Sequence, residues 1–420
     1  MDGSQQSLEA VSSFFDSPKV HIERIPIGQG IPLGIERISN AEIGIGGAYG
    51  TWGDDYDNEA LPHLLERRLG EPLNGEEILN LSELGFIHRH HLPKLSDEEN
   101  IELEVKVGAR FLCEAARACG WEPAEVQGVV VGTTVPVVDD YTERIAREAG
   151  IPDSALKVSV HKACDGSVAG LNLALNPNVP INEGLVHNLA EEFYGKKVLV
   201  WGIEGLSRMI IQSRDKNAIQ LFANGAGVIG VIPGKTMKFL VGKTHEAFDE
   251  EGVLAVRMSY PHSRHRVANH SMIEVTQTGA NHIRIARLMH EPEEQVPVVM
   301  AGMMGMVKLF VRTGVQVVHD VYQDYQNKMA ELGVPGKKIA VAIVHHANFK
   351  INQLIDKHLQ KEGIQIPMPW LLKEFGNVSA ASNMIAFLRK LSTLKPRDNV
   401  LFDGFGAGTY YDVLAVELGG

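Results

Sequence analysis

The sequence has little cysteine and none of the common metal-binding patterns. Its three cysteines are too few for a disulfide framework. Two of them, Cys113 and Cys119, lie in a helical pattern over residues 101–119 that predicts buried thiols. No CxxC pair or HExxH motif is present, so the sequence gives no indication of a metal site.

Long apolar runs are also missing from the 420 residues. No stretch reaches the length that spans a membrane, and residues 1–6 are polar, unlike the charged and then apolar start of a signal peptide. Together with the few cysteines, these absences predict a cytoplasmic protein in a reducing compartment.

Positive charge is scarce, because 40 Lys and Arg stand against 52 Asp and Glu, for a net charge of −12. Nucleic acids need a basic face on their partner, so this balance argues against nucleic-acid binding. To bind an acidic partner, this acidic chain would need a local patch of basic residues. The hydrophobic content of 44% is ordinary for a globular protein, and the length permits two domains or one duplicated domain.

Strand-like and helix-like stretches alternate along the chain, which predicts an α/β protein. Two series of elements look like copies of one unit. The paired segments are residues 127–134 with 338–344, the strand-to-helix junction at Cys164 with that at Asn377, and the glycine turns 223–227 with 404–408. Two halves that each supply one helix N-terminus would place a site between them.

We therefore expect an N-terminal half over residues 1–236, with an insertion over 177–196, and a C-terminal half over 299–420. Residues 237–298 match neither copy and show little apolar periodicity, so we expect loops and edge strands that cover the site. A group of basic side chains lies in this segment: His262, Arg264, His265, Arg266 and His270.

Cys164 is the most informative position in the chain. Residues 157–160 alternate as a strand should, and residues 168–176 form a helix of apolar and small side chains. A thiol in the first turn of a buried helix lies near unpaired N–H groups and the positive end of the helix dipole, and both favour the thiolate. His345 and Asn377 follow later in the chain. Cysteine, histidine and asparagine in this order are the parts of a covalent thioester enzyme.

These residues resemble motifs of the thiolase superfamily, specifically of its β-ketoacyl-ACP synthase III branch. The family's Ala-Cys-x-Gly, His-Gln-Ala-Asn-x-Arg-Ile and Gly-Asn-Thr-Ser-Ala-Ala-Ser segments correspond here to Ala-Cys-Asp-Gly at 163–166, His-His-Ala-Asn-Phe-Lys-Ile at 345–351 and Gly-Asn-Val-Ser-Ala-Ala-Ser at 376–382. A glycine-rich closing turn at 405–408 and a Met-x-Gly segment at 300–302 also match. The resemblance implies a five-layered αβαβα thiolase fold made of two duplicated halves.

The resemblance also implies a decarboxylating condensation. Cys164 would take an acyl group from an acyl-CoA or acyl-ACP. His345 and Asn377 would then donate to the carbonyl oxygen of a malonyl thioester while carbon dioxide leaves, and the carbanion would attack the acyl group on Cys164. The backbone N–H groups of Cys164 and Ala407, next to Gly406, would form a second oxyanion hole. Asn377 is also a candidate N-cap for the helix that follows it.

A helix predicted over residues 349–361 presents Lys350, Lys357 and Lys361 on one face. These lysines form either a solvated stripe or, as the resemblance implies, a docking surface for an acyl carrier protein or for coenzyme A phosphates. The resemblance further implies a homodimer and thioester substrates, with no metal or redox cofactor.

The sequence departs from the family at several of these positions. Asp165 follows the cysteine where a small neutral residue is usual, and a carboxylate there would raise the thiol pKa unless it points away. Tyr411-Asp412 replaces a common Trp-Gly pair. We assign His346 a supporting role and His161 a structural one.

Three other functions fit parts of the pattern. A thiolase-fold acyltransferase would pass the acyl group from Cys164 to a hydroxyl or amine of a specialised metabolite, although Asn377 favours decarboxylation. A papain-like protease also orders Cys, His and Asn in this way, but its Cys-Gly-Ser-Cys-Trp context is missing. The third alternative is a catalytically silent partner subunit, but such a subunit would not need the intact set of Cys164, His345 and Asn377.

Overall fold

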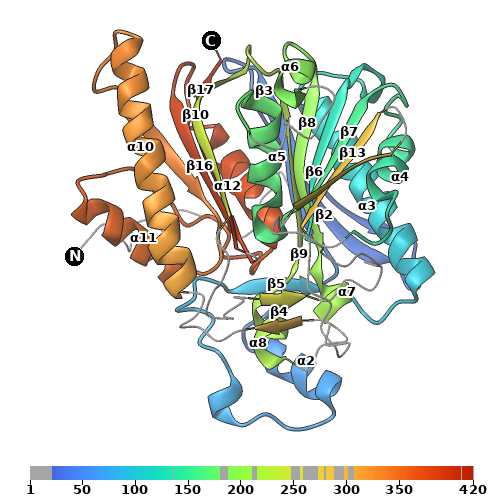
Figure 1. The fold of residues 1–420 in the computed structure, drawn as a ribbon. Helices are drawn as coiled ribbons and strands as arrows, with labels where there is room; N and C mark the ends of the chain where they lie inside the picture. Colours follow the sequence, from blue (N-terminus) through green and yellow to red (C-terminus); the bar gives the residue numbers. More distant parts are fainter. Residues whose placement is uncertain are drawn as a thin grey trace.

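Two large β-sheets form the frame of the molecule (Figure 1). The structure is a computed structural model, and it describes residues 21–134, 136–179, 188–210, 215–246, 256–258, 273–278, 281–287, 298–300, 307–407 and 409–419. Part of the expected insertion (180–187), the basic cluster at 262–270 and Gly408 lie outside this described part. So do residues 301 and 302 of the Met-x-Gly segment.

The larger sheet is built around strands that are apolar on both faces. β6 (Gly128–Gly132) and β8 (Val198–Gly205) are wholly buried and run parallel to each other, as is typical of strands covered by helices on both faces. Within the described residues the order is β1-β2-β3-β9-β8-β6-β7-β13-β12. The remaining bounds are β1 (His21–Ile25), β2 (Ile31–Asn40), β3 (Ile45–Trp52), β9 (Asn224–Val231), β7 (Leu156–His161), β13 (His282–Arg287) and β12 (Ile273–Thr278).

The smaller sheet has the order β10-β17-β16-β15 in the described part of the chain. β15 (Ile339–Val344) runs parallel to β16 (Asn399–Gly406), and β17 (Tyr410–Leu418) pairs antiparallel with both β16 and β10 (Met237–Glu246). The second sheet therefore begins at Met237, inside the segment for which the sequence predicts loops and edge strands that cover the site, and not at residue 299. β10 is an edge strand with mostly half-buried side chains, so it lacks the apolar run of a central strand.

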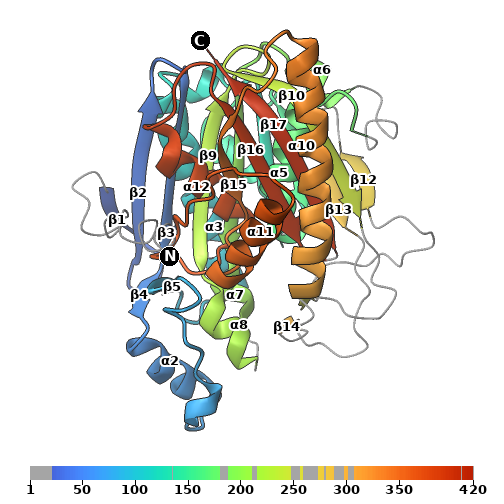
Figure 2. The ribbon, with the colours of Figure 1, turned by 90° about the vertical axis from the view of Figure 1, so that its left-hand side faces the viewer.

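Helices lie in three layers around the sheets (Figures 1 and 2). The middle layer separates the two sheets, and every residue of its helix α5 is buried because both of its faces are packed. The outer layers cover the larger sheet on one side and the smaller sheet on the other, which gives the expected five-layered αβαβα arrangement. The helices are α5 (Gly166–Leu175) and α12 (Ser382–Leu391) in the middle, α3 (Asp97–Ala118) and α4 (Tyr141–Glu148) on the larger sheet, and α10 (Gly314–Glu331) and α11 (Phe349–Lys361) on the smaller one. The bounds of α11 confirm the predicted helix.

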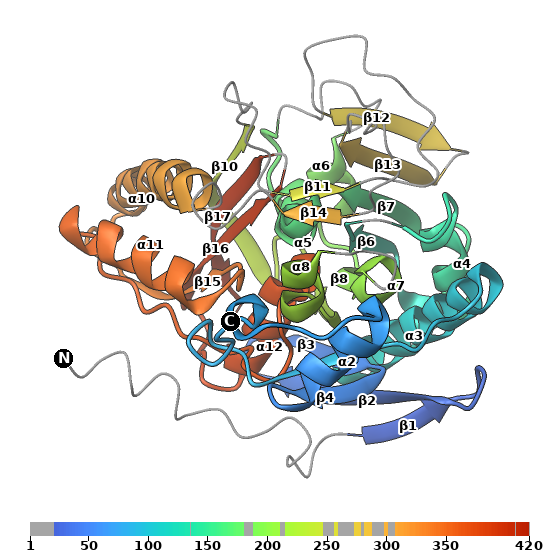
Figure 3. The same ribbon diagram turned by 90° about the horizontal axis from the view of Figure 1, so that it is seen from below.

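Several shorter elements gather at one end of the molecule (Figure 3). They are α2 (Ala60–Leu69), β4 (Asp54–Asp57), β5 (His88–His91), α7 (Leu206–Ile210), α8 (Lys216–Leu221), β11 (Val256–Met258) and β14 (Val298–Met300). α6 (Leu189–Phe193), in the expected insertion, packs against α5. No helix in the described ranges combines the length and apolar character needed to cross a membrane.

The duplication is clearest at two matching turns, η3 (Ala163–Asp165) before α5 and η6 (Ser379–Ala381) before α12. The first residue of each has a positive φ, 50° at Ala163 and 45° at Ser379. Each is preceded by a residue of similar conformation and followed directly by a middle-layer helix. The counterpart of Cys164 is therefore Ala380, at a spacing of 216 residues, and not Asn377, at 213.

The predicted match between the two glycine turns is also wrong. Gly406 ends β16 and pairs with Tyr410 at the start of β17, whereas Gly205 ends β8 and pairs with Asn224 at the start of β9. Gly406 therefore corresponds to Gly205, since both close the strand that precedes the last strand of each half. The glycines after Asn224 instead lie within β9.

Candidate active site

Cys164 is the middle residue of η3, where β7 passes directly into α5. Its side chain is buried and forms no disulfide. The left-handed conformation of Ala163 makes the sharp turn possible, and such strained residues cluster at functional sites. The turn places the thiol at the N-terminal end of α5, where backbone N–H groups and the helix dipole favour a thiolate.

The end of β16 lies directly against this turn. A Cβ atom added at Gly406 would be 2.9 Å from the backbone nitrogens of Cys164 and Asp165 and 2.9 Å from the carbonyl oxygen of Lys162. Only glycine permits this approach without displacing backbone. Ala407, the predicted oxyanion-hole residue, follows immediately and is buried. The structure thus brings together the predicted residues Cys164, Gly406 and Ala407.

His345 directly follows β15, and its backbone nitrogen donates to the carbonyl oxygen of Asp403 at 2.9 Å. Its ring is buried and lies edge-on to Phe405, with centroids 5.0 Å apart. Burial lowers the pKa of His345 to about 3, with a smaller effect from His346, so the ring is neutral near pH 7. Nδ1 lies 2.6 Å from the hydroxyl oxygen of Ser382. The single hydrogen of that hydroxyl has a second acceptor, Oδ1 of Asn383, at the longer distance of 3.3 Å. When the hydroxyl donates to the nearer Nδ1, the ring proton is on Nε2.

Asn377 has a fixed side-chain orientation. Its Oδ1 accepts from the backbone nitrogen of Ser379 at 2.9 Å, and its Nδ2 donates to the carbonyl oxygen of Ala347 at 3.2 Å. The helix α12 begins only at Ser382, after η6, so Asn377 closes the turn before the helix and is not its N-cap. Because an amide nitrogen carries two hydrogens, the bond to Ala347 leaves Asn377 one further hydrogen to donate.

The loops that carry these residues are joined by direct contacts. Phe405 touches His345, and the next residue, Gly406, lies against the nitrogen of Cys164. Asn377 bonds to Ala347, two residues after His345. The turns η3 and η6 also contact each other. The segments that carry Cys164, His345 and Asn377 therefore lie together near the C-terminal end of β16.

Glu204, at the end of β8, is a buried carboxyl group that the sequence analysis missed. It accepts from the backbone nitrogen of Thr134 at 2.8 Å, from the Thr134 hydroxyl at 2.6 Å and from the backbone nitrogen of Ala380 at 3.2 Å. Burial raises the pKa of Glu204 to about 8. Because Ala380 is the counterpart of Cys164, Glu204 binds the N–H that corresponds to the predicted oxyanion donor of the other half. In the sequence, this buried carboxyl group could have been predicted from a charged residue at the end of an otherwise apolar strand.

An ionic cluster flanks the nucleophile. The ammonium of Lys162 lies 2.5 Å from Oδ2 of Asp412 and 3.4 Å from Oδ2 of Asp165. The Asp165 side chain packs against Gly404, where an added Cβ would be 2.3 Å from its Oδ1. Burial, followed by the Asp412 carboxylate, raises the pKa of Asp165 well above its usual range.

The three predicted docking lysines all lie exposed on α11. Lys350 forms an ion pair of 2.5 Å with Glu83, and both side chains are more than half exposed. For Lys357 and Lys361 the described residues provide no acidic partner within ion-pair distance. The free positive charge on this helix face is therefore at Lys357 and Lys361.

The two other histidines discussed in the sequence analysis, His346 and His161, lie within hydrogen-bond distance of backbone groups. His346 bonds through Nδ1 to the carbonyl oxygen of Val344 at 2.7 Å, and its Nε2 accepts from the backbone nitrogen of Leu371 at 3.0 Å. His161 is buried, with Nδ1 3.4 Å from the carbonyl oxygen of Thr133. Burial lowers the pKa of His161 to about 3 and that of His346 to about 4.

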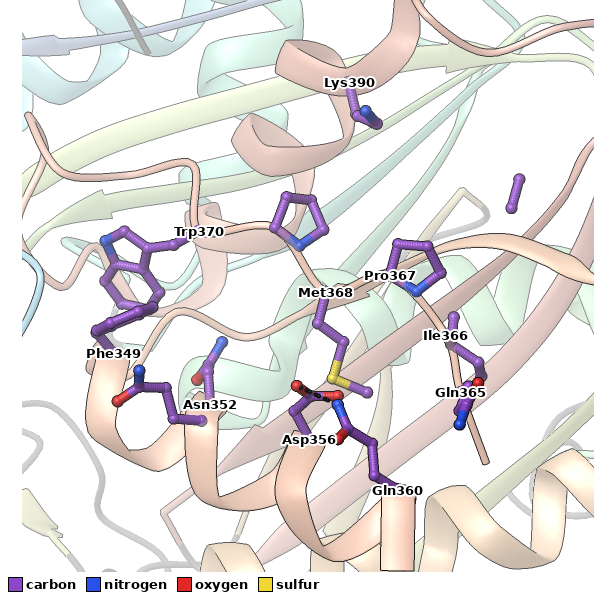
Figure 4. Close-up of a pocket in the computed structure, with 13 residues that line it drawn as sticks. Phe349, Asn352, Asp356, Gln360, Gln365, Ile366, Pro367, Met368, Trp370 and Lys390 are labelled. Carbon is purple, nitrogen blue, oxygen red and sulfur yellow. Dashed lines mark hydrogen bonds between the residues drawn. The ribbon is translucent and has the colours of Figure 1, made fainter. Parts of the chain in front are cut away.

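A pocket of about 830 Å³ lies between α11 and residues 365–370, whose Trp370 packs against the ring of His346 (Figure 4). Phe349, Met368 and Ile366 contribute apolar surface, and Asp356 and Gln360 contribute polar atoms joined by a 2.9 Å hydrogen bond. Its lining includes none of the predicted catalytic residues, so it is separate from the candidate active site.

Comparisons with known proteins agree with the motifs. Residues 329–418 match the family model described as 3-Oxoacyl-[acyl-carrier-protein (ACP)] synthase III C terminal. The mycobacterial beta-ketoacyl-[acyl-carrier-protein] synthase III of Mycobacterium ulcerans is 37% identical over 95 residues, and this match spans only 22% of the chain and 28% of that relative. A beta-ketoacyl-[acyl-carrier-protein] synthase III of Helicobacter pylori is 22% identical over 350 residues, which cover 82% of the chain and 93% of the relative.

Among solved structures, the β-ketoacyl-[acyl-carrier-protein] synthase III of Thermus thermophilus aligns with a TM-score of 0.62 and 17% identity. The alignment covers 90% of this chain and 98% of that one. The likeness shows that the chain has the predicted thiolase fold. Together, the comparisons confirm the predicted resemblance to β-ketoacyl-ACP synthase III.

Proposed function

We propose, from its thiolase fold and its resemblance to β-ketoacyl-ACP synthase III, that this chain is a condensing enzyme with Cys164 as its nucleophile. One observation supports the proposal most strongly. The end of β16 contacts the Cys164 turn through Gly406 and the His345 ring through Phe405, so residues far apart in sequence meet at one place.

In the first step, the Cys164 thiolate attacks the carbonyl carbon of an acyl thioester of coenzyme A or acyl carrier protein. The N–H groups of Cys164 and Ala407 stabilise the oxyanion, and the donor thiol leaves as the C–S bond to its acyl group breaks. The product is an acyl thioester on Cys164. The N-terminal end of α5 favours this step because it favours the thiolate.

In the second step, a malonyl thioester loses carbon dioxide. The electron pair of the breaking C–C bond moves into an enolate, whose oxygen accepts from Nε2 of His345 and Nδ2 of Asn377. Because burial keeps His345 neutral, it donates without becoming a charged acid. Each such donor lowers the barrier by about 3 kcal/mol. The enolate carbon then attacks the acyl group on Cys164, which releases a β-ketoacyl thioester and the free thiolate.

This chemistry uses coenzyme A or phosphopantetheine thioesters as substrates and needs no metal or redox cofactor. A homodimer, a cytoplasmic location and a docking role for the α11 lysines remain predictions from the resemblance and the composition.

Intact-mass spectrometry after incubation with a panel of acyl-CoAs and acyl-ACPs tests the first step, with Cys164→Ala as the control. We expect an acyl adduct on the wild type alone. Malonyl-dependent release of carbon dioxide then tests the second step. An adduct without any carbon dioxide release would instead favour transfer to a hydroxyl or amine, and no adduct from any donor would contradict the proposed enzyme.

A further inference from the structure

A buried group of one ammonium and two carboxyl groups flanks the nucleophile, and the catalytic steps do not use it. Lys162 and Asp165 lie on either side of Cys164 in the chain, and Asp412 reaches the group from β17. Their relative exposures are 3%, 0% and 1%. Burying a charge costs free energy unless it is paired, and one cation can balance only one of the two carboxylates. One of the two carboxyl groups must therefore carry a proton for the cluster to be neutral.

The hydrogen bonds identify which carboxyl group is charged. Asp412 receives the Lys162 ammonium at 2.5 Å, the Asn172 amide at 2.8 Å and the Thr244 hydroxyl. Neither oxygen of Asp165 accepts a hydrogen bond from a described residue. Three donors favour an ionised Asp412. Burial is the largest effect on Asp165 and favours its protonated form, against the opposing effect of the Lys162 ammonium 3.4 Å from its Oδ2. The directions of the pKa shifts agree. Although burial opposes its charge, Asp412 has a lowered pKa because Lys162 and the other donors stabilise its carboxylate.

We propose that Asp412, whose negative charge is held in place by Lys162, keeps Asp165 in its neutral form and thereby keeps negative charge away from the residue next to the nucleophile Cys164. Asp412 and Lys162 then act as positioning residues that tune the reactivity of the thiol through Asp165. The inference rests on the proposed function only in taking Cys164 as the nucleophile. It also explains why two departures from the family, at Asp165 and Asp412, occur together.

Among the described residues, the other titratable side chains at the cluster are Glu246 and Tyr410, whose ring centroid lies 5.4 Å from the Lys162 ammonium. Glu246 on β10 is half-buried, and burial raises its pKa against the opposing effect of Lys162. Within the described residues, α5 contributes the neutral Asn172 and β16 contributes Gly404. Asp412 is therefore the main anion that acts on Asp165.

Removing the charge of Asp412 should lower the reactivity of the Cys164 thiol. In Asp412→Asn, Lys162 has Asp165 as its nearest carboxyl group, so Asp165 ionises. A carboxylate next in sequence to Cys164 raises the thiol pKa by about one unit or more. Because the thiolate is the reactive form, alkylation below that pKa slows by about tenfold for each unit. Asp165→Asn keeps a neutral side chain of the same shape and leaves the thiol unchanged.

The test is the rate of iodoacetamide alkylation at Cys164, followed by peptide mass mapping from pH 5 to 10. The proteins compared are the wild type, Asp165→Asn, Asp412→Asn and the double variant. We expect slow alkylation only in Asp412→Asn, with the double variant restored to within about twofold of the wild type. Equal slowing in Asp412→Asn and the double variant would show a purely structural effect and overturn the proposal. A large effect of Asp165→Asn alone would also overturn it.

Alkylation needs no acyl donor, so this test does not depend on the outcome of the acyl-transfer assay. Should Asp412→Asn not fold, the comparison of wild type with Asp165→Asn still decides, because the proposal requires their alkylation profiles to coincide. Mapping also separates Cys164 from Cys113 and Cys119, whose pKa values are raised by burial.

Discussion

Gly406 and Cys164 are separated by 242 residues in sequence, yet the Cα atom of Gly406 leaves no room for a side chain beside the backbone nitrogen of Cys164. This approach joins the nucleophile turn of the first half to the last strands of the second. The next residue, Ala407, lies in the same buried apolar cluster as Ala163 of this turn. The relationship links the geometry of the proposed oxyanion hole to a single glycine.

Gly406→Ala is expected to remove most of the acylation of Cys164. The added methyl would lie 2.9 Å from three backbone atoms that cannot move independently, which costs about 1–3 kcal/mol of stability. Loss of an aligned oxyanion donor slows acylation by about 10²–10³-fold. Intact-mass time courses and thermal unfolding measure both effects. Gly75→Ala is the control, because an added Cβ there meets no atom within 4 Å. Acylation at the wild-type rate in Gly406→Ala would contradict the assigned oxyanion hole.

His345→Ala is expected to separate the two steps. Acylation of Cys164 should persist, because His345 donates only to the malonyl-derived enolate. Malonyl decarboxylation should fall by about 10²–10³-fold. The measurements are the acyl adduct mass and the release of labelled carbon dioxide, with the exposed His63→Ala as the control. Equal loss of both steps would place His345 in acylation instead.

Local sequence patterns were sufficient to predict the bounds of α11, the strand-to-helix turn at Cys164 and the strand that ends before His345. They were not sufficient for the register of the duplication. Asn377 occupies a motif that resembles the Cys164 junction, but the true counterpart is set by the backbone conformations of Ala163 and Ser379. Those conformations depend on packing between the two halves, which no local pattern reports.

Polar contacts between residues far apart in the chain could not be predicted from the sequence either. Asp165 and Asp412 were each visible as departures from the family, but only the fold shows that both lie beside Lys162. Likewise, Glu204 is a single acidic residue at a strand end until Ala380 is seen to donate to it. Hydrogen bonds between residues this far apart have no periodicity from which they could be predicted.

Buried histidines predict a protein that loses stability in acid. Burial lowers the pKa of His90, His161 and His345 to about 3 and that of His346 to about 4, from 6.5. As pH falls below 6.5, the unfolded chain binds protons that the folded chain does not, so the free energy of unfolding falls. Each group contributes about 1.4 kcal/mol per pH unit until its folded pKa is reached.

Buried carboxyl groups with raised pKa values act in the opposite direction, because the folded chain binds protons there that the unfolded chain does not; they include Glu204, at about 8, and Asp403, at about 7. Because the buried histidines outnumber these carboxyl groups, urea unfolding from pH 6.5 to 4.5 should still show a net loss, and a free energy of unfolding that rises over this range would contradict it.

Glu204→Ala is expected to destabilise the fold. The change leaves the buried backbone N–H groups of Thr134 and Ala380 without their acceptor, at about 1–3 kcal/mol for each unsatisfied group. Urea unfolding at pH 7 measures the difference. Glu83→Ala is the matched control, since it removes only exposed contacts, the ion pair with Lys350 and a hydrogen bond from Asn80, and an exposed ion pair contributes less than about 1 kcal/mol. Equal free energies of unfolding for the two variants would show that water replaces the Glu204 carboxyl group.

Charge reversal at Lys357 and Lys361 distinguishes a docking surface from a solvated stripe. These lysines share one exposed face of α11, whereas the charge of Lys350 is already offset by Glu83. If an acidic carrier protein docks there, Lys357→Glu with Lys361→Glu should raise KM for acyl-ACP about tenfold or more, most strongly at low salt, because surface charges act over a Debye length of about 10 Å at 0.1 M salt. The kcat should not change, because neither lysine reaches the Cys164 turn.

The matched control is Lys328→Glu on α10, an exposed lysine that pairs with Glu331 on its own helix. Parallel assays with acyl-CoA separate the two donors that the lysines were predicted to serve. A rise in KM for acyl-ACP alone assigns the surface to the carrier protein, and a rise for both donors assigns it to phosphate groups that they share. Unchanged KM for both donors at low salt would identify a solvated stripe, whose charge serves solubility rather than recognition.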